Sequence, residues 1–221
     1  MEADLSFQTV VLPAESSTAL EQALSWLRRG QVVVFPTDTV YGLGAPMEDV
    51  GAVERLFRVK GRPRPMGIPL LLAEAGDVER VCQQVPDLAW RLMERFWPGG
   101  LTLVLWRKPV VPDVVTGGRA TVAVRLPAHH VPRELAGRLG GALAATSANR
   151  SGASSPVMAA EVQAQLGGRI PLILDGGRCP AEQPSTIVDL TVDPPSLLRI
   201  GPVGPGEIEA VLGRLCRSDR S

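Results

Sequence analysis

Residues 31–44 read QVVVFPTDTVYGLG, and this stretch indicates the class of fold. Its first part, Gln31–Phe35, is a short β-branched run that stops at Pro36, which is typical of a buried strand. Four side chains that form hydrogen bonds follow within five residues, before two glycines: Thr37, Asp38, Thr39 and Tyr41. Because open α/β sheets bind ligands beyond the carboxyl ends of their strands, the stretch predicts a binding site. The alternative is an ordinary polar turn.

Helical and strand patterns alternate along the rest of the chain. Apolar residues at helical spacing predict helices over 16–30, 49–59, 77–84, 87–96, 132–139, 157–166 and 207–215. Apolar and β-branched runs predict strands over 68–73, 101–106, 121–126, 142–146, 171–174, 185–190 and 196–200. We therefore expect an α/β fold with a twisted mixed sheet, in which the last two strands are antiparallel. A single domain over residues 1–221 is expected, with a motif-bearing core at 16–203 and a C-terminal helix within 205–216.

Composition excludes several classes of protein. The chain has 221 residues with 23 Lys+Arg and 23 Asp+Glu, and this balance disfavours nucleic-acid binding through bulk charge. Three widely spaced cysteines cannot form a closed set of disulfides or a usual zinc site, so free thiols and a cytoplasmic location are expected. No apolar run approaches the roughly 20 residues of a membrane-spanning helix, and no membrane partner is expected.

Common catalytic motifs are missing from the sequence. There is no GxxxxGK[ST] phosphate loop and no GxSxG elbow. His129 and His130 are neighbours, so we expect their side chains to point apart and not to share a metal. The favoured interpretation of the pair is the start of a surface helix. Covalent and zinc hydrolases of the standard kinds are therefore disfavoured.

A cationic stretch and a lone strand arginine are candidates for binding anions. Four cations stand within seven residues, with no acid among them: Arg58, Lys60, Arg62 and Arg64. Pro63 and Pro65 stiffen this stretch, which would suit a polyphosphate; the alternative is a solvated face. Arg125 lies in an apolar run and needs an anionic partner, either a structural carboxylate or that of a ligand.

A loop of small and hydroxyl-bearing residues, 144–156, follows another predicted strand. Its five hydroxyls and Asn149 precede a helix expected to start near Pro156, an arrangement that suits an anion. The alternative is a serine-rich loop with Ser155 as the helix cap. Ser185 and Arg199 lie at the ends of adjacent strands. Together these features favour an enzyme that positions ATP against a second substrate.

Ordered motifs from about residue 20 to residue 201 resemble the YrdC family of L-threonylcarbamoyladenylate synthases. They are PTDTVYGLG (36–44), KGRP (60–63) with Pro69-Leu70, WPGGL (97–101), VAVRLP (122–127), the segment 146–156 and PSTIVD (184–189). The resemblance implies a YrdC-like sheet and helices around a concave cavity. It also implies a reaction in which L-threonine, bicarbonate and ATP give threonylcarbamoyl-AMP and pyrophosphate, for threonylcarbamoyladenosine modification of tRNA.

The resemblance implies partners and residue roles as well. Mg²⁺ is expected mainly on the ATP phosphates, with no protein metal ligand and no organic cofactor. Other proteins transfer the threonylcarbamoyl group, and tRNA is at most an indirect partner. The catalytic set is Lys60, Arg62 and Tyr41, and the L-threonine set is Thr39, Arg125, Ala145 and Ser185. The ATP set is Lys60, Arg62, Thr121, Ser147, Asn149, Ser155 and Arg199.

The chain departs from the family pattern in two places. The Arg64–Ile68 segment makes the loop after Pro63 two residues longer than in many relatives, and Ala73 stands where some relatives carry a histidine. The resemblance is to the single-domain version of the family. Two alternatives remain open: an RNA-binding module without catalysis, and a carbamoyl-transfer domain of the hydrogenase-maturation type.

Overall fold

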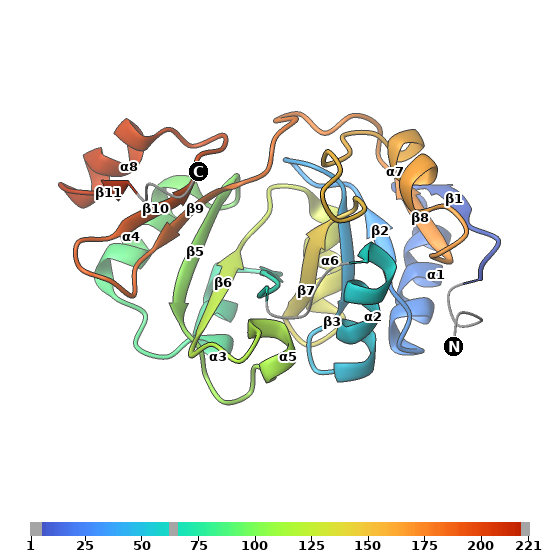
Figure 1. The fold of residues 1–221 in the computed structure, drawn as a ribbon, viewed down its shortest axis with the longest axis horizontal. Helices are drawn as coiled ribbons and strands as arrows, with labels where there is room; N and C mark the ends of the chain where they lie inside the picture. The colour runs from blue at the N-terminus through green and yellow to red at the C-terminus, as the bar shows by residue number, and fades with distance from the viewer. Residues whose placement is uncertain (1–5, 62–65, 218–221) are drawn as a thin grey trace.

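The computed structural model describes residues 6–61 and 66–217 (Figure 1). The strands are β1 (Val10–Pro13), β2 (Val33–Phe35), β3 (Gly42–Pro46), β4 (Leu70–Leu72), β5 (Leu101–Trp106), β6 (Thr121–Arg125), β7 (Ala142–Ser147), β8 (Leu172–Asp175), β9 (Thr186–Asp189), β10 (Ser196–Arg199) and β11 (Cys216–Arg217). The α-helices are α1 (Ser17–Arg28), α2 (Val50–Lys60), α3 (Val78–Val81), α4 (Asp87–Phe96), α5 (Asp113–Thr116), α6 (His130–Gly137), α7 (Ala159–Leu166) and α8 (Pro205–Leu212), and η2 (Ala75–Asp77) is a 3-10 turn.

The strands form one continuous mixed sheet. Their order is β1-β8-β2-β3-β7-β4-β6-β5-β9-β10-β11. The parallel pairs are β1–β8, β8–β2, β4–β6, β5–β9 and β10–β11, and the other neighbours are antiparallel. The mixed sheet and the antiparallel β9–β10 pair confirm the predicted fold class.

Strand β3 lies where the sequence analysis predicted no strand. Glycine is a poor indicator of a strand, but here Gly42 and Gly44 are required by the ring of Phe35 on β2. A Cβ atom at these two positions would lie 2.7 Å and 2.6 Å from Phe35 ring carbons. The register pairs Phe35 with Gly42, so the ring covers the bare backbone of the partner strand. The polar turn between the two strands is thereby held at one end of the sheet.

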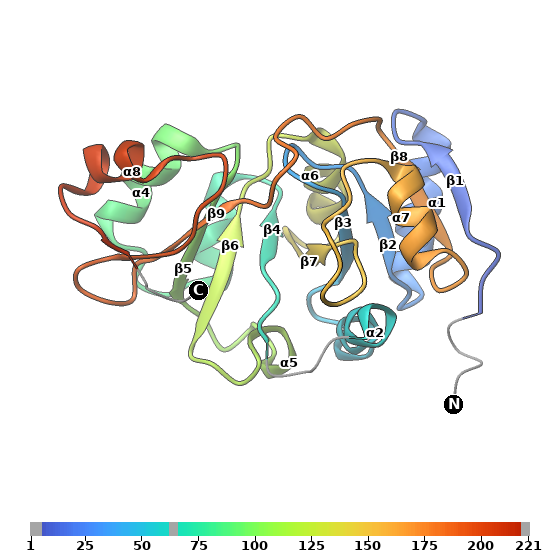
Figure 2. The same cartoon turned by 45° about the horizontal axis from the view of Figure 1, so that its top comes forward.

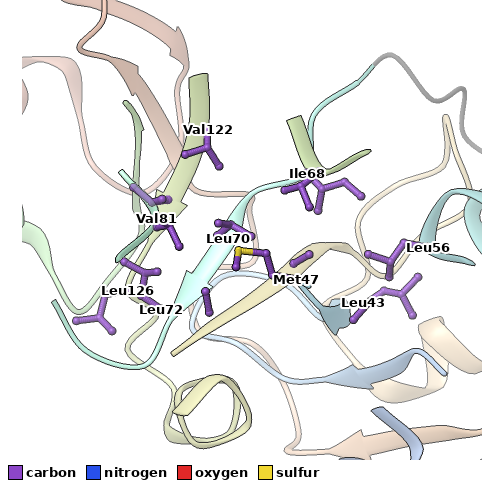
Figure 3. Close-up of a cluster of buried hydrophobic side chains, with 14 of the residues drawn as sticks. Leu43, Met47, Leu56, Ile68, Leu70, Leu72, Val81, Val122 and Leu126 are labelled. Atoms are coloured by element: carbon purple, nitrogen blue, oxygen red, sulfur yellow. The ribbon is translucent and has the colours of Figure 1, made fainter. Parts of the chain in front are cut away.

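Helices cover both faces of the sheet around β2. Val33 and Phe35 belong to a core with α1 and α6, whereas Val32 and Val34 belong to a second core with α2 and α7. This alternation places successive side chains of β2 on opposite faces, as a strand requires. The second core continues under β4 and β6, and Figure 3 shows Leu70 and Leu72 within it. Burial on both faces explains why the run at 32–35 lacks polar residues.

Several element boundaries differ from the predictions. Helix α7 begins at Ala159 with Met158 as its N-cap, so the prediction of a start near Pro156 and the alternative of a Ser155 cap were wrong. The helix predicted over 77–84 is the short pair η2 and α3, and the C-terminal helix ends at Leu212. The sequence analysis missed β1, α5 and β11, which are two to four residues long and carry little periodicity.

The connection from β8 to β9 passes over the middle of the molecule (Figures 1 and 2). Backbone hydrogen bonds hold it at two points: Cys179 N–H donates to Val157 O at 2.9 Å, and Ala181 N–H donates to Asp38 O at 3.1 Å. It ends at Ser185, directly before β9. Among the described residues all three cysteines are free thiols, and no helix is long and apolar enough to cross a membrane.

Candidate active site

A cavity of about 320 Å³ lies where the turn after β2, the end of β6 and the start of β9 meet. It contains most of the residues that the sequence analysis predicted for the site. Those that line it are Thr39, Tyr41, Arg125, Ala145, Ser147, Ser155, Ser185 and Arg199. Thr37, Thr102, Met66, Gly67, Pro69 and Leu71 are further lining residues. Most of the family motifs therefore contribute residues to one cavity although they are far apart in sequence.

Arg125 stands at the end of β6 and is almost completely buried. Each nitrogen of its guanidinium has one partner: Nε donates to Gly99 O at 2.8 Å, Nη1 to Thr39 Oγ1 at 2.7 Å and Nη2 to Asp38 Oδ1 at 2.6 Å. Burial lowers the pKa of Arg125, and the negative charge of Asp38 opposes that shift. A guanidinium stays charged at neutral pH, and with five N–H donors it keeps capacity for a ligand.

The turn after β2 positions Thr39, whose hydroxyl accepts a hydrogen bond from Arg125. Thr37 Oγ1 accepts hydrogen bonds from the backbone N–H groups of Thr39 and Val40, at 3.0 Å and 3.2 Å, and donates to Val40 O at 2.7 Å. This hydroxyl-closed turn fixes the backbone of Thr39. The Thr39 hydroxyl accepts from Arg125, so the turn positions the acceptor of this hydrogen bond.

Arg199 brings a second guanidinium to the rim of the cavity. Its Nε donates to Ser185 O at 2.8 Å and its Nη2 to Ser185 Oγ at 3.1 Å. The Ser185 hydroxyl also shares a 2.7 Å hydrogen bond with Thr102 Oγ1. Burial, and then the positive charge of Arg125, lower the pKa of Arg199. The two arginines therefore interact electrostatically. The cavity offers two cations to one or more anionic groups.

The hydroxyl of Tyr41 forms hydrogen bonds within the protein. It lies against the turn after β8, donates to Gly177 O at 2.7 Å or Asp175 Oδ1 at 3.1 Å, and accepts from Gly176 N–H at 3.2 Å. Burial raises its pKa well above the ordinary value, so the phenol stays protonated. A hydrogen bond to bicarbonate or carbamate would require these bonds to break. Tyr41 does line the cavity, and its catalytic role stays a prediction.

Lys60 and Asn149 lie behind the cavity wall and not in it. The buried Lys60 ammonium donates to Ser147 O, to Asn149 O at 2.8 Å and to Asn149 Oδ1 at 3.0 Å. Asn149 Nδ2 donates in turn to Arg150 O at 2.9 Å and Ala153 O at 2.7 Å. These bonds hold the loop after β7 in shape, so the two residues support Ser147 and do not face the cavity themselves.

The remaining positions named in the sequence analysis lie outside the cavity, in the longer loop or outside the described residues. Thr121 is on the same face of β6 as Arg125, four residues away, but does not line the cavity. Arg62 lies outside the described residues, as does Arg64. Met66 and Gly67, from the longer loop, do line the cavity. Ala73 lies beyond β4, where its carbonyl accepts from Arg133 Nε at 3.0 Å.

The two histidines do not point apart, which corrects the prediction. Their rings stack with centroids 4.9 Å apart, and His129 Nδ1 caps α6 by accepting from Val131 N–H at 3.2 Å. The expected helix start at this pair is confirmed. Over residues 6–61 and 66–217, no cluster of three or more His, Cys, Asp or Glu side chains could hold a metal ion. The described lining residues include no carboxylate, imidazole or thiol.

Sequence reasoning missed the partnership of Asp38 with Arg125 and the contribution of Thr102. Both acids and hydroxyls are common beside strands, so their residue types alone did not mark them. A buried arginine does indicate that an acid must be near, but the acid is 87 residues away in sequence. The available signal was the position of Asp38 at the end of a strand, where the residues of an α/β site gather.

The fold and the cavity define an α/β protein with a hydroxyl-lined cavity that holds two arginines near the ends of its strands. The model of the Sua5/YciO/YrdC family, described as "Telomere recombination", matches residues 25–201, and the chain belongs to this family. The threonylcarbamoyl-AMP synthase of Pyrococcus abyssi is 45% identical over 87% of this chain and 57% of that protein. A putative threonylcarbamoyl-AMP synthase of Mycobacterium tuberculosis is 40% identical over 91% of this chain and 92% of that protein.

A solved structure agrees with these sequence relatives. The crystal structure of P. abyssi Sua5 complexed with L-threonine has a TM-score of 0.90 and 42% identity, and the match covers 96% of this chain and 62% of that one. The present chain thus spans little more than half the length of the P. abyssi relative. The shared fold confirms the expected YrdC-like architecture.

Proposed function

We propose that this chain is a threonylcarbamoyl-AMP synthase, which uses L-threonine, bicarbonate and ATP to form threonylcarbamoyl-AMP and pyrophosphate. The observation that carries the proposal is the presence of two guanidinium groups, Arg125 and Arg199, in one cavity lined with hydroxyls. The names of the relatives from P. abyssi and M. tuberculosis support it, as does the L-threonine in the related crystal structure.

In this proposal the inner end of the cavity binds L-threonine. Arg125 donates charge-assisted hydrogen bonds to the carboxylate, beside the hydroxyls of Thr39 and Ser185. Ala145 and Leu71 leave apolar surface for the methyl group of the substrate. A guanidinium that is already held by three acceptors loses little freedom when the carboxylate binds, which favours affinity.

ATP would bind at the rim, with its phosphates toward Arg199. Ser147 and Ser155 also line the cavity, and Lys60 and Asn149 stabilise the loop that carries Ser147. The described lining residues present no carboxylate cage, so the donor set fits a divalent cation carried by the phosphates. Such a cation would supply charge neutralisation to the polyphosphate.

The chemistry needs positioning more than proton transfer. The threonine amine and bicarbonate form a carbamate with loss of water, and a carbamate oxygen then attacks the α-phosphorus while pyrophosphate leaves. Both reacting groups are anionic, so the cavity must hold them together against repulsion. The charges of Arg125 and Arg199 do this, and a fixed geometry lowers the entropic barrier.

The wider setting of the reaction is also proposed. Transfer of the threonylcarbamoyl group to tRNA would be carried out by other proteins, in the cytoplasm. The alternative of an RNA-binding module gains no support from the surface, because Trp106 is the one aromatic among the exposed large apolar side chains of the described residues. A stacking platform needs several such rings.

The decisive experiment is detection of threonylcarbamoyl-adenylate by mass spectrometry after incubation of the chain with the three substrates. Omission of any one substrate should remove the product. Arg125→Ala should lower threonine-dependent pyrophosphate release by roughly 100-fold or more, because it removes charge-assisted hydrogen bonds. ATP should still bind to this variant.

Arg138→Ala is the matched control, since Arg138 is an exposed arginine paired with Glu21 on the outer surface. It should keep full activity. Absence of the adenylate with the unmodified chain, or an unchanged threonine dependence in Arg125→Ala, would contradict the proposed function.

A further inference from the structure

Asp38 contacts three segments that enclose the cavity. Its Oδ1 accepts from Arg125 Nη2 at 2.6 Å and from Ala128 N–H at 3.1 Å, and its carbonyl accepts from Ala181 N–H at 3.1 Å. The segments are the end of β6, the loop after it and the connection that leads to Ser185. A single residue in the turn after β2 therefore joins the parts that carry the predicted threonine contacts.

The pair of Asp38 and Arg125 is largely withdrawn from water. Their side chains are 15% and 7% exposed. A buried guanidinium without a counter-charge is costly, and Arg199 adds a second positive charge to the same cavity. Among the described residues, Asp38 is the one carboxylate that forms an ion pair with Arg125. It therefore offsets the charge that would otherwise drive the two arginines apart.

The geometry also restricts how the guanidinium can turn. Gly99 O, Thr39 Oγ1 and Asp38 Oδ1 each hold a different nitrogen, so the plane of the group is fixed. Asp38 supplies the only charged member of this set among the residues described. Because Asp38 does not line the cavity, it would reach a substrate only through Arg125.

We propose that Asp38 is the positioning residue for Arg125: it aims the guanidinium at the carboxylate of the amino-acid substrate and balances its charge. The inference rests on the proposed function, because it assumes that Arg125 binds that carboxylate. It assigns Asp38 to recognition of the amino acid and not to the nucleotide. Substitution of Asp38 should therefore impair the use of threonine much more than the binding of ATP.

The test is a double-mutant cycle on kcat/KM for L-threonine, with KM for ATP measured in parallel. Asp38→Asn keeps the size and one acceptor oxygen but removes the charge. It should lower kcat/KM for threonine about 10-fold or more, the effect typical of residues that orient a ligand-binding group, and change KM for ATP less than about 2-fold. In an Arg125→Lys background, which lacks the fork of donors, the same change should cost less than about 3-fold.

Asp193→Asn is the matched control, because Asp193 forms an exposed ion pair with Arg214. It should leave both substrates unaffected. Equal losses for threonine and ATP, or effects of Asp38→Asn and Arg125→Lys that simply multiply, would overturn the positioning role. The thermal unfolding temperature of each variant shows whether a loss of activity comes from a loss of folded protein. Failure of the unmodified chain to form the adenylate would contradict the proposed function, whereas a multiplicative cycle in an active enzyme would contradict only the role of Asp38.

Discussion

Lys60 shows how one buried charge can shape a binding loop without entering the cavity. Its ammonium donates to oxygens of Ser147 and Asn149, and the residue is 4% exposed. A backbone hydrogen bond joins the same two segments, because Ser151 N–H donates to Lys60 O at 2.9 Å. The C-terminal end of α2 and the loop after β7 are thus joined as one unit.

Lys60→Met should therefore destabilise the protein by about 2–4 kcal/mol, because buried carbonyl oxygens lose their donor. ATP affinity should fall more than threonine affinity, since Ser147 moves with the loop. Urea unfolding and calorimetry with each substrate measure the two effects. Lys108→Met is the control, because the Lys108 ammonium bonds to Glu79 O at an exposed position and should matter little. A free energy of unfolding equal to that of the original chain would refute this account of Lys60.

At the scale of elements, the β9–β10 pair positions Ser185 through a close approach at Gly201. A Cβ atom on Gly201 would lie 2.3 Å from Pro184 O and 2.5 Å from Thr186 N, which are backbone atoms and cannot rotate away. Position 201, the second residue after β10, must therefore lack a Cβ atom for the start of β9 to keep its place beside the cavity. The sequence identified both strands, but the crowding arises only when they pair.

Gly201→Ala should displace the backbone around Ser185, weaken threonine binding and lower stability by roughly 1–3 kcal/mol. Threonine calorimetry and thermal unfolding check this expectation. Gly206→Ala in α8 is the comparison, because its Cβ would meet nothing within 4 Å. If Gly201→Ala bound threonine as tightly as Gly206→Ala does, the close approach at Gly201 would not be needed for threonine binding.

At the scale of the whole molecule, the cavity exists because a single sheet runs through both parts of the chain. β3 and β7 lie on one side of the cavity and β6, β5 and β9 on the other, with β4 pairing between them. The larger core continues from α2 and α7 beneath β4 to α4 and α8. No break in the packing separates the two sides over the described residues, so we expect them to unfold together.

Native-state hydrogen exchange tests this expectation directly. Amides of β2 and β5, at opposite sides of the cavity, should report the same free energy of opening, while the edge strand β1 should exchange faster. Saturation with ATP and threonine should raise both values equally, because the ligands bind only the assembled cavity. A lower free energy at β5 than at β2 would mean that the two parts open independently.

The sequence by itself determined the alternation of strands and helices, the motifs of the family and most residues of the cavity. These are local properties: periodicity records which faces are buried, and polar residues gather where strands end. The sequence did not predict the glycine-containing strand β3, because its pairing depends on the ring of Phe35. It also did not predict the hydrogen bonds of the Tyr41 hydroxyl, because their partners come from the turn after β8.

Only the tertiary structure decided which charges meet. The position of Arg125 in an apolar run predicted an anionic partner. The sequence of that strand alone could not show whether the protein or a ligand supplies the anion. The fold brings Asp38 to Arg125, and it turns Lys60 toward Asn149 and away from the cavity. The energy of a buried charge depends on its distance to other charges in space, and residues far apart along the chain acquire that distance only when the sheet assembles.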